Sequence, residues 1–595
     1  MRVLSTLLFS GLLAFGLSSP ASATPAAQLR VNGWYPCTYS TTLGGANSSM
    51  VPFECAEVDV PLCHQDVCKS DKVINLFVRR QLTKAKPAGA KRKALWLLQG
   101  GPGDSSFVLE NDMTNMNFLL NETLDLYTVD HRGTGRSTFL ECKAAQAFAA
   151  GSPDGVDPTV SEIPNCVRDI LFQIDNHTEA FSVTSAAKDV VHLVENLYTG
   201  DTVDTFIYGV SYGTYWASRI MHLAPANVKG YILDGVVDES SPTFTTFNSK
   251  RIVVEKRFIE LCETDKFCSS QLKAEIKEFG SLTKAWKAIF ADLDSAKSTR
   301  KACAKLLGKV FPAGTPSFGL RQFFAEMVKL PDQRLLVPAI MHRLYLCKAK
   351  DVEFLSSAVF VDPDAESSGA DDADATKPPV TAYDQIQSSS LFLGQLIKAS
   401  EMWTNPSPSW TSQLQDFEAG LFSYNATFDF ATFCYFTANF SDPTCSGFVE
   451  LHPEIDFKTL QTPKFAYTPD PKYWKKPARI PDHASALLFN GDLDFLTTTE
   501  WGMHEYENLE GGDKMVVNFS FGGHGSGMRP STFSDDIMCG YQIIASFVLQ
   551  SGDVAKVDTS CMETLPPLQF DDILAIQSVF PTMLTADELY DSSKA

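Results

Sequence analysis

The sequence predicts an α/β protein whose mostly parallel sheet is flanked by helices and interrupted by a large, mostly helical cap insertion. Short apolar runs of strand length recur in the first part of the chain and return near its end. An amphipathic helix lies between two of them, and this alternation is typical of a parallel sheet covered on both faces. Longer helical patterns fill the stretch between the two sets of strands.

The first set of expected strands contains the segments VINLFVRRQL, ALWLL, LDLYTVDHRG, DTFIYGVS and VKGYILDGVV. Before DTFIYGVS, the segment TSAAKDVVHLVENLYTG predicts a helix capped by Thr184 or Ser185 and stopped at Gly200. The helical patterns SKRIVVEKRFIELCE and LTKAWKAIFADL follow. Strands return with ASALLFNGDLD and KMVVNFSFGGHG, and a helix is expected over 535–549.

These patterns divide the chain into a signal peptide, two parts of one core domain, an insertion and a tail. The expected bounds are 1–23 for the signal peptide, 24–241 and 481–563 for the core, 242–480 for the insertion with an acidic low-complexity loop near 361–379, and 564–595 for the tail.

The N-terminal residues predict secretion. Arg2 gives a basic start, residues 4–17 are mainly apolar, and Ala21-Ser22-Ala23 is a small-residue cleavage site. No later run of about twenty apolar residues follows, so we expect a soluble, secreted protein with no membrane-spanning helix.

All 14 cysteines follow the expected cleavage site, an even number that suits up to seven disulfides in a secreted protein. Neither a CxxC pair nor a histidine-rich cluster suggests a metal, and no metal or cofactor is expected. Pairs close in sequence are Cys63/Cys68, Cys262/Cys268, Cys434/Cys445 and Cys539/Cys561. Glycosylation sequons occur at Asn47, Asn121, Asn176, Asn425, Asn439 and Asn518.

The net charge of −21 argues against nucleic acid or an anionic membrane as a partner, because both would repel the chain. With 44% apolar residues the chain can bury a large core. The oligomeric state is left open.

Four signals lie at the carboxyl ends of expected strands, where open α/β sheets place their binding crevice. Ser211 stands in Gly-Val-Ser-Tyr-Gly, the spacing of a nucleophile elbow. The turn QGGPG at 99–103 can direct backbone N–H groups at an oxyanion. Asp492 and Asp494 follow one strand, and His524 lies between glycines after another. The order serine, aspartate, histidine along the chain is that of α/β-hydrolases.

The set QGGPG, DHRGTGRS, GVSYGTYWAS, ILDGVVD, GDLDFLT and GGHG resembles the secreted prolyl and tripeptidyl aminopeptidase family of α/β-hydrolases. Residues 484–561 are similar to that family's tripeptidyl-aminopeptidase-like C-terminal region. The resemblance covers most of the mature chain and weakens inside the insertion. It departs from the family pattern at Gln99, where histidine is common, and at Thr498, where proline is common.

The resemblance implies a nucleophile at Ser211, an orienting acid at Asp494 and a general base at His524. Asp494 is preferred to Asp492 because the family acid precedes an apolar-x-Thr segment. The oxyanion hole would be formed by the backbone N–H groups of Gly101 and Tyr212. In ASEMW, Glu401 matches an acid before an aromatic residue and is the candidate for binding a substrate's amino group. Asp130 and Arg132 of DHRGTGRS are expected to be structural.

The function expected from these residues is a secreted serine exopeptidase that cleaves short peptides from the N-terminus through an acyl-enzyme. The insertion would roof the site and admit chain ends. One alternative is a serine carboxypeptidase, although that family has glutamate where this chain has Val210. An esterase or lipase, and a catalytically inactive binding protein with the same fold, are the others.

Overall fold

The computed structural model describes residues 30–37, 53–83, 91–120, 123–143, 158–198, 203–241, 244–360, 389–451, 462–532 and 538–591. The expected signal peptide at 1–23 and the acidic loop at 361–379 lie outside these residues.

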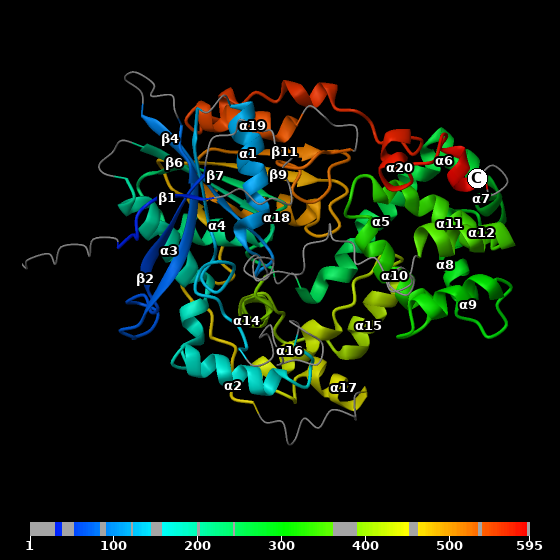
Figure 1. Cartoon of the computed structure of the whole chain (residues 1–595), viewed down its shortest axis with the longest axis horizontal. Helices are drawn as coiled ribbons and strands as arrows, with labels where there is room; N and C mark the ends of the chain where they lie inside the picture. Colours follow the sequence, from blue (N-terminus) through cyan, green and yellow to red (C-terminus); the bar gives the residue numbers. More distant parts are fainter. Residues whose placement is uncertain are drawn as a thin grey trace, which may run out of the picture.

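A nine-stranded sheet forms the centre of the molecule, in the order β1-β2-β3-β5-β4-β6-β7-β9-β11 (Figure 1). The strands from β5 to β11 in that order are parallel to one another, and β3 runs antiparallel to its neighbours β2 and β5. The strands are β1 (Tyr35–Cys37), β2 (Phe53–Pro61), β3 (Val73–Gln81), β4 (Arg92–Leu98), β5 (Asp125–Val129), β6 (Val203–Val210), β7 (Val228–Asp234), β9 (Ser485–Gly491) and β11 (Lys514–Phe519). A separate pair joins β8 (Arg479–Ile480) to β10 (Glu510–Gly511).

Helices cover both faces of the sheet, and the central strands are apolar on both sides for that reason. In β4, Trp96 and Leu98 enter one buried cluster while Leu95 and Leu97 enter the other. The first face is covered by α2 (Ile163–Gln173), α3 (Val183–Asn196) and α4 (Tyr212–Leu223), and the second by α1 (Leu109–Leu119) and α19 (Cys539–Leu549).

The start of α3 differs from the prediction. The Ser182 side chain accepts the backbone N–H of Ser185 at 3.2 Å, so Ser182 is the N-cap in place of Thr184 or Ser185. Three of the four residues from 182 to 185 carry a hydroxyl group, and the sequence pattern does not show which of the three is the N-cap.

All the regular elements described between β7 and β8 are helices, so the predicted α/β fold with a mostly helical insertion is confirmed (Figure 1). One group of insertion helices has a buried cluster of its own, and a second group packs into the cluster on the first face of the sheet. The first group is α5 (Phe247–Thr264), α6 (Lys266–Gln271), α7 (Lys273–Phe279), α8 (Leu282–Leu293), α9 (Lys301–Val310), α10 (Pro316–Met327), α11 (Val337–Leu346) and α12 (Ala349–Phe354). The second is α14 (Leu391–Glu401), α15 (Trp410–Ala419), α16 (Thr427–Thr437) and α17 (Pro443–Leu451).

The C-terminal tail returns to the insertion. Its helices α20 (Ile573–Val579) and α21 (Asp587–Tyr590) bury apolar side chains in the cluster of the first group. In Figure 1, α20 lies beside helices of that group. Arg343 on α11 donates hydrogen bonds to the carbonyl oxygens of Leu589 at 2.6 Å and Glu588 at 2.7 Å. The tail is therefore part of the folded insertion.

All fourteen cysteines are paired, and the four short pairs expected from the sequence are among the seven disulfides. The others are Cys37–Cys55, Cys142–Cys166 and Cys303–Cys347. Seven disulfides are compatible with an extracellular protein. In the described part of the chain no helix is both long enough and apolar enough to cross a bilayer.

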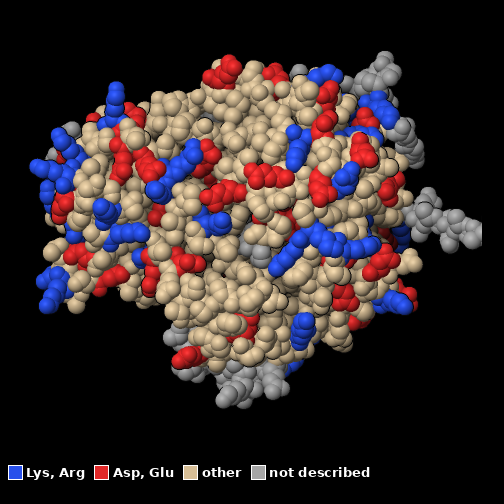
Figure 2. Space-filling view, turned by 180° about the vertical axis from the view of Figure 1, so that it is seen from behind, with Lys and Arg blue, Asp and Glu red and all other residues tan. Residues whose placement is uncertain are grey.

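Figure 2 shows acidic and basic side chains interspersed over the face opposite to that of Figure 1. The excess negative charge of the chain is thus mixed with positive charge on this face rather than gathered in one patch.

Candidate active site

The turn after β6 holds Ser211 in a rare backbone conformation, with φ 58° and ψ −129°. The tight turn leaves no room for side chains at Gly209 and Gly213, the glycines two residues before and after Ser211. A Cβ on Gly209 would lie 2.1 Å from the carbonyl oxygen of Gly213, and a Cβ on Gly213 would lie 2.3 Å from that of Leu98. Ser211 donates its N–H to the carbonyl oxygen of Asp234 at 2.9 Å, which fixes the turn against β7. The strand therefore turns into α4 with Ser211 at the apex, as in a nucleophile elbow.

Asp494, just after β9, is fully buried and accepts four hydrogen bonds. The backbone N–H groups of Leu496 (2.7 Å) and Thr497 (2.8 Å) bind Oδ1, and the Thr497 hydroxyl binds Oδ2 at 2.8 Å. The fourth donor is Nδ1 of His524, 2.9 Å from Oδ2. Asp492, the other candidate, is instead paired with Arg257 of α5. The geometry thus brings Asp494, the aspartate preferred from the sequence, to the histidine.

His524 lies on the loop after β11, and its side chain is 18% exposed. Burial acts against the charged ring, but the adjacent carboxylate of Asp494 outweighs it and holds the pKa of His524 above its ordinary value. The ring packs against Gly235, the residue that follows β7, since a Cβ there would lie 2.9 Å from its Cε1. Asp494 therefore both orients the imidazole and stabilises its protonated form.

Two buried side chains that sequence reasoning did not assign hold the loop of His524. Asp234 accepts the N–H of Gly527 at 2.9 Å and the hydroxyl of Tyr208 at 2.7 Å, and burial raises the pKa of Asp234 to about 6. Arg334, in the 3₁₀ turn Gln333–Leu336, donates to the carbonyl oxygens of Phe521 at 2.8 Å and Ser531 at 2.7 Å. Asp234 stands in the motif ILDGVVD, which offered a signal, whereas no sequence pattern singles out Arg334.

Ser211 opens into two cavities. The larger, of about 430 Å³, extends under the insertion, and the smaller, of about 240 Å³, is also lined by His524. Gly101, Asp104 and Leu496 line both cavities together with Ser211. Among the described residues no hydrogen bond joins Ser211 Oγ to His524, but the two side chains line the same space. Catalytic contacts of this kind often tighten only when substrate is bound.

The two residues expected to form an oxyanion hole lie beside the serine. Tyr212 is the first residue of α4, so its N–H has no acceptor within the helix. Gly101 lines the same cavities as Ser211. The neighbouring Gly100 packs directly on the serine, because a Cβ there would lie 2.7 Å from Ser211 Cβ. Gln99 lines the smaller cavity.

The DHRGTGRS loop has the structural role expected of it. Asp130 is fully buried and accepts hydrogen bonds from Ser106 at 2.7 and 2.8 Å and from Arg136 at 2.8 and 3.0 Å. Arg132, also fully buried, forms a two-pronged ion pair with Asp189, with both contacts at 2.6 Å. These contacts fasten the loop to the core and involve neither cavity.

The structure does not bring Glu401 to either cavity. Its buried carboxylate accepts hydrogen bonds from Arg219 at 2.9 Å, Tyr215 at 3.1 Å and Tyr467 at 2.7 Å. The residues that line the two cavities do not include it. The segment ASEMW places this acid at the last position of α14, on the side that packs against α4.

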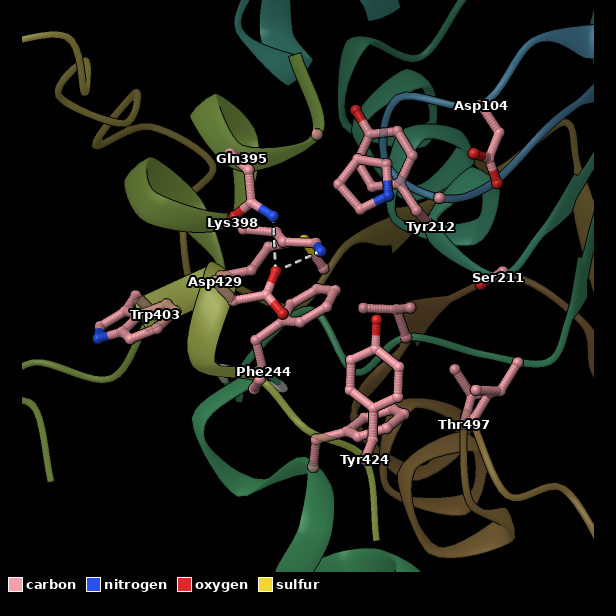
Figure 3. A pocket seen from close by; sticks show the side chains of 18 of the residues that line it. Asp104, Ser211, Tyr212, Phe244, Gln395, Lys398, Trp403, Tyr424, Asp429 and Thr497 are labelled. Carbon is pink, nitrogen blue, oxygen red and sulfur yellow. Dashed lines mark hydrogen bonds and ion pairs between the residues drawn. The ribbon is translucent and has the colours of Figure 1, made fainter. Parts of the chain in front are cut away.

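Seven aromatic residues, three acids and three bases are among the residues that line the larger cavity, several of which Figure 3 shows. Asp429 accepts hydrogen bonds from Lys398 at 2.8 Å and Gln395 at 2.6 Å. The second acid and base, Glu326 and Lys329, are also in contact with each other. The remaining two, Asp104 and Arg251, have no ion-pair partner within 4 Å among the described residues. The aromatic lining residues are Tyr212, Phe244, Phe247, Trp403, Tyr424, Phe430 and Trp501.

Among the described residues one group has its possible metal-ligating atoms close together, namely Cys63, Cys68 and His177. Because the two cysteines form a disulfide, their sulfur atoms are not thiolates and the group does not make a metal site.

The strand order, the elbow at Ser211 and the chain order of serine, aspartate and histidine are those of an α/β-hydrolase fold. No protein-family profile and no curated protein matches this chain. Solved structures similar to it include an esterase from Exiguobacterium antarcticum, with 12% identity, a TM-score of 0.29 and coverage of 80% of this chain and 96% of that chain. Others are an esterase from Rhodococcus sp. ECU1013 (12% identity, TM-score 0.28) and a laboratory-evolved variant of potato epoxide hydrolase (13% identity, TM-score 0.28), each covering 80% of this chain and 96% of that chain. Because these TM-scores are low, the fold assignment rests on the topology and the site geometry.

Proposed function

We propose that this α/β-hydrolase-fold protein is a serine exopeptidase that removes residues from the N-terminus of peptides through an acyl-enzyme. The observation that carries the proposal is the hydrogen bond between Asp494 and His524 at a cavity that also contains the strained Ser211. A strained serine beside an aspartate-oriented imidazole is the arrangement that activates a hydroxyl as a nucleophile.

In this mechanism His524 takes the hydroxyl proton of Ser211 while Oγ attacks the carbonyl carbon of the scissile bond. The N–H groups of Gly101 and Tyr212 stabilise the oxyanion, each contributing about 3 kcal/mol of barrier lowering. His524 then gives the proton to the leaving amine, and a water molecule activated by the same imidazole releases the acyl group. Asp494 stays ionised throughout and stabilises the imidazolium.

From the position of His524 we infer which cavity takes each side of the scissile bond. The leaving amine must lie near the imidazole that protonates it, hence in the smaller cavity. The acyl part, which carries the peptide's N-terminus, then occupies the larger cavity under the insertion. A volume of about 430 Å³ is that of a pocket for a small molecule or a short peptide end and too small for a folded chain.

An aminopeptidase must also bind the α-ammonium group of its substrate, and Asp104 is the carboxylate we propose for this role. The other acids of the larger cavity, Glu326 and Asp429, already have a lysine partner, and Glu401 is buried elsewhere. Among the described residues Asp104 accepts a side-chain hydrogen bond only from the Ser389 hydroxyl, and it lines both cavities with Ser211. In Figure 3, Asp104 and Ser211 lie on one side of the cavity and Asp429 on the other.

Two experiments test the function. A fluorophosphonate probe should label the wild-type protein and should not label Ser211→Ala; equal labelling would show that Ser211 is not the nucleophile. Peptides with a free N-terminus should be cleaved, and acetylation of that end should abolish cleavage, while amidation of the C-terminus should not. The opposite pattern would identify a carboxypeptidase, and the masses of the products give the number of residues released.

Asp104→Asn tests the ammonium site, with Asp429→Asn as the matched change across the cavity. The first should lower kcat/KM for free peptides and leave the rate of fluorophosphonate labelling near that of the wild type. If only Asp429→Asn loses the preference for a free N-terminus, Asp429 and not Asp104 binds the substrate's α-ammonium group.

A second candidate, an esterase, is favoured by the aromatic lining of the larger cavity, which suits an apolar acyl group. Turnover of aryl esters without turnover of any peptide in a mixed library would select this activity. The seven disulfides support an extracellular setting for either activity.

A further inference from the structure

We propose that Arg251 forms a carboxylate-binding subsite in the larger cavity, so that the enzyme prefers peptides that carry an acidic group in the part bound there. The proposal rests on the proposed function, because it names the substrate class of that same site. Arg251 lies on α5, one turn after two other residues that line the cavity, Phe247 and Asn248.

Arg251 is a cation with unused hydrogen-bond donors. It is only 2% exposed, and its one hydrogen bond among the described residues runs from Nη2 to the carbonyl oxygen of Ala325 at 3.2 Å. Its Nε is buried, and no described residue accepts a hydrogen bond from it. The guanidinium carbon also lies 5.1 Å from the centre of the Phe247 ring, a weaker contact. A buried arginine usually has a carboxylate on its planar fork, and this one has none within 4 Å in the described chain.

The acids nearest to Arg251 are engaged elsewhere. Glu255 accepts the backbone N–H groups of Leu421 at 2.7 Å and Phe422 at 2.9 Å. The carboxylate of Glu326 contacts Lys329, and that of Asp494 is filled by its own loop and the catalytic histidine. Burial lowers the pKa of Arg251 to about 10, which the charges of these acids only partly oppose. Arg251 remains protonated at neutral pH, and its buried charge costs desolvation free energy that a bound anion would offset.

A carboxylate is the group that best fits this position. The guanidinium presents N–H donors in one plane, which match the two oxygens of a carboxylate, and the aromatic surroundings strengthen the attraction by excluding water. The other bases in the lining, Lys329 and Lys398, are already paired with acids. Arg251 is therefore the cation of the cavity that is available to a substrate.

The carboxylate that fits this subsite is an aspartate or glutamate side chain on the N-terminal side of the scissile bond, because the peptide's C-terminus belongs to the leaving part in the smaller cavity. One set of peptides tests this source against the C-terminal carboxylate. Two sets of peptides of four to six residues with a free N-terminus are compared. In the first set glutamine stands at each position in turn, and in the second set glutamate stands at the same position. Each peptide is also made as the free acid and as the amide. The measured quantity is the ratio of kcat/KM for glutamate over glutamine, or for acid over amide.

In the wild type one position should favour glutamate over glutamine by about 10- to 100-fold, the range expected for hydrogen bonds to a charged group. Arg251→Met should reduce this ratio to near one, and Arg251→Lys should retain part of it. A preference for the free acid over the amide that disappears in Arg251→Met would instead put the C-terminal carboxylate at Arg251, and it would overturn both the subsite and the assignment of the acyl part to the larger cavity. Because each ratio compares two substrates on one enzyme, partial unfolding of a variant does not change it.

Lys256→Gln is the matched control, since it removes a positive charge from the same helix at an exposed position. It should leave every ratio at the wild-type value. Equal use of glutamate and glutamine peptides by the wild type, or a preference that survives Arg251→Met, would overturn the subsite. Cleavage of the glutamine peptides with fluorophosphonate labelling of Ser211 would then still support the proposed function, and absence of both would refute that function instead.

Discussion

Gly213→Ala should disable the site while leaving most of the fold assembled. Gly213 occupies the first turn of α4, two residues after Ser211, and faces the end of β4. A Cβ at this position would lie 2.3 Å from the carbonyl oxygen of Leu98, whereas ordinary contacts begin at 3.4 Å. The two elements must therefore separate by about 1 Å, and both sides of the contact are backbone, which cannot rotate away.

The size of the effect follows from this displacement. Overpacking by one methyl group in a rigid contact costs about 1–3 kcal/mol of folding free energy. Separation of α4 from β4 also moves Ser211 relative to Gly101, because Leu98 directly precedes the loop of Gly101. A misplacement of about 1 Å between reacting groups costs on the order of 10²-fold in rate. We therefore expect a modest loss of stability and a large loss of activity.

The assay is urea unfolding together with the rate of fluorophosphonate labelling. Gly308→Ala in α9 is the control, because a Cβ there meets nothing within 4 Å. The same chemical change should stabilise the protein by about 0.5–1 kcal/mol at this position, through helix propensity, and leave labelling unchanged. If Gly213→Ala labels as fast as Gly308→Ala, the turn at Ser211 does not depend on the close approach seen in the structure.

Three further changes probe the surroundings of the site. In the wild type kcat/KM should rise with pH through the pKa of His524, because the imidazole acts as a base only when it is neutral. This pKa lies above the ordinary value of about 6.5. Asp494→Asn should lower kcat by about 10⁴-fold and shift this rise to lower pH, since the carboxylate that raises the pKa is gone. Arg334→Met should lose hydrogen bonds worth about 1.5–3 kcal/mol and speed amide hydrogen exchange in the loop of His524, and unchanged exchange would contradict its role. Glu401→Ala should cost about 3 kcal/mol in urea unfolding, because buried Arg219 would keep only its more distant partner Glu239, at 3.9 Å, yet it should leave the ratio of free to acetylated peptide turnover unchanged.

The sheet and the approximate position of the site could be predicted because they depend on local patterns. Apolar runs mark the strands of a covered parallel sheet, and the polar residues that follow them meet at one edge. Ser211, Asp494 and His524 each follow such a run, so their approach to one another follows from topology alone. The short disulfides were predictable for a similar reason, since a few residues of chain keep two cysteines close.

The insertion could not be predicted in the same detail, because its important contacts join residues far apart in the sequence. Arg219 and Glu401 are 182 positions apart, and neither residue shows in the sequence that the other is its partner. Glu401 was assigned to substrate from its neighbours in the chain, whereas packing of α14 against α4 places it in an ion pair. The unmatched charge of Arg251 is equally invisible in the sequence, since it depends on which nearby acids are already engaged.

The insertion holds the loops of the proposed active site in place as well as covering them. Ser390 donates its N–H to the carbonyl oxygen of Gly103 at 2.8 Å, beside the expected oxyanion turn. Arg257 of α5 pairs with Asp492, two residues before the acid that orients the histidine. Arg334 holds the histidine's own loop at both ends. Each loop that must converge on Ser211 thus has a bond to the insertion, so removal of the insertion would dismantle the site instead of merely opening it to larger substrates.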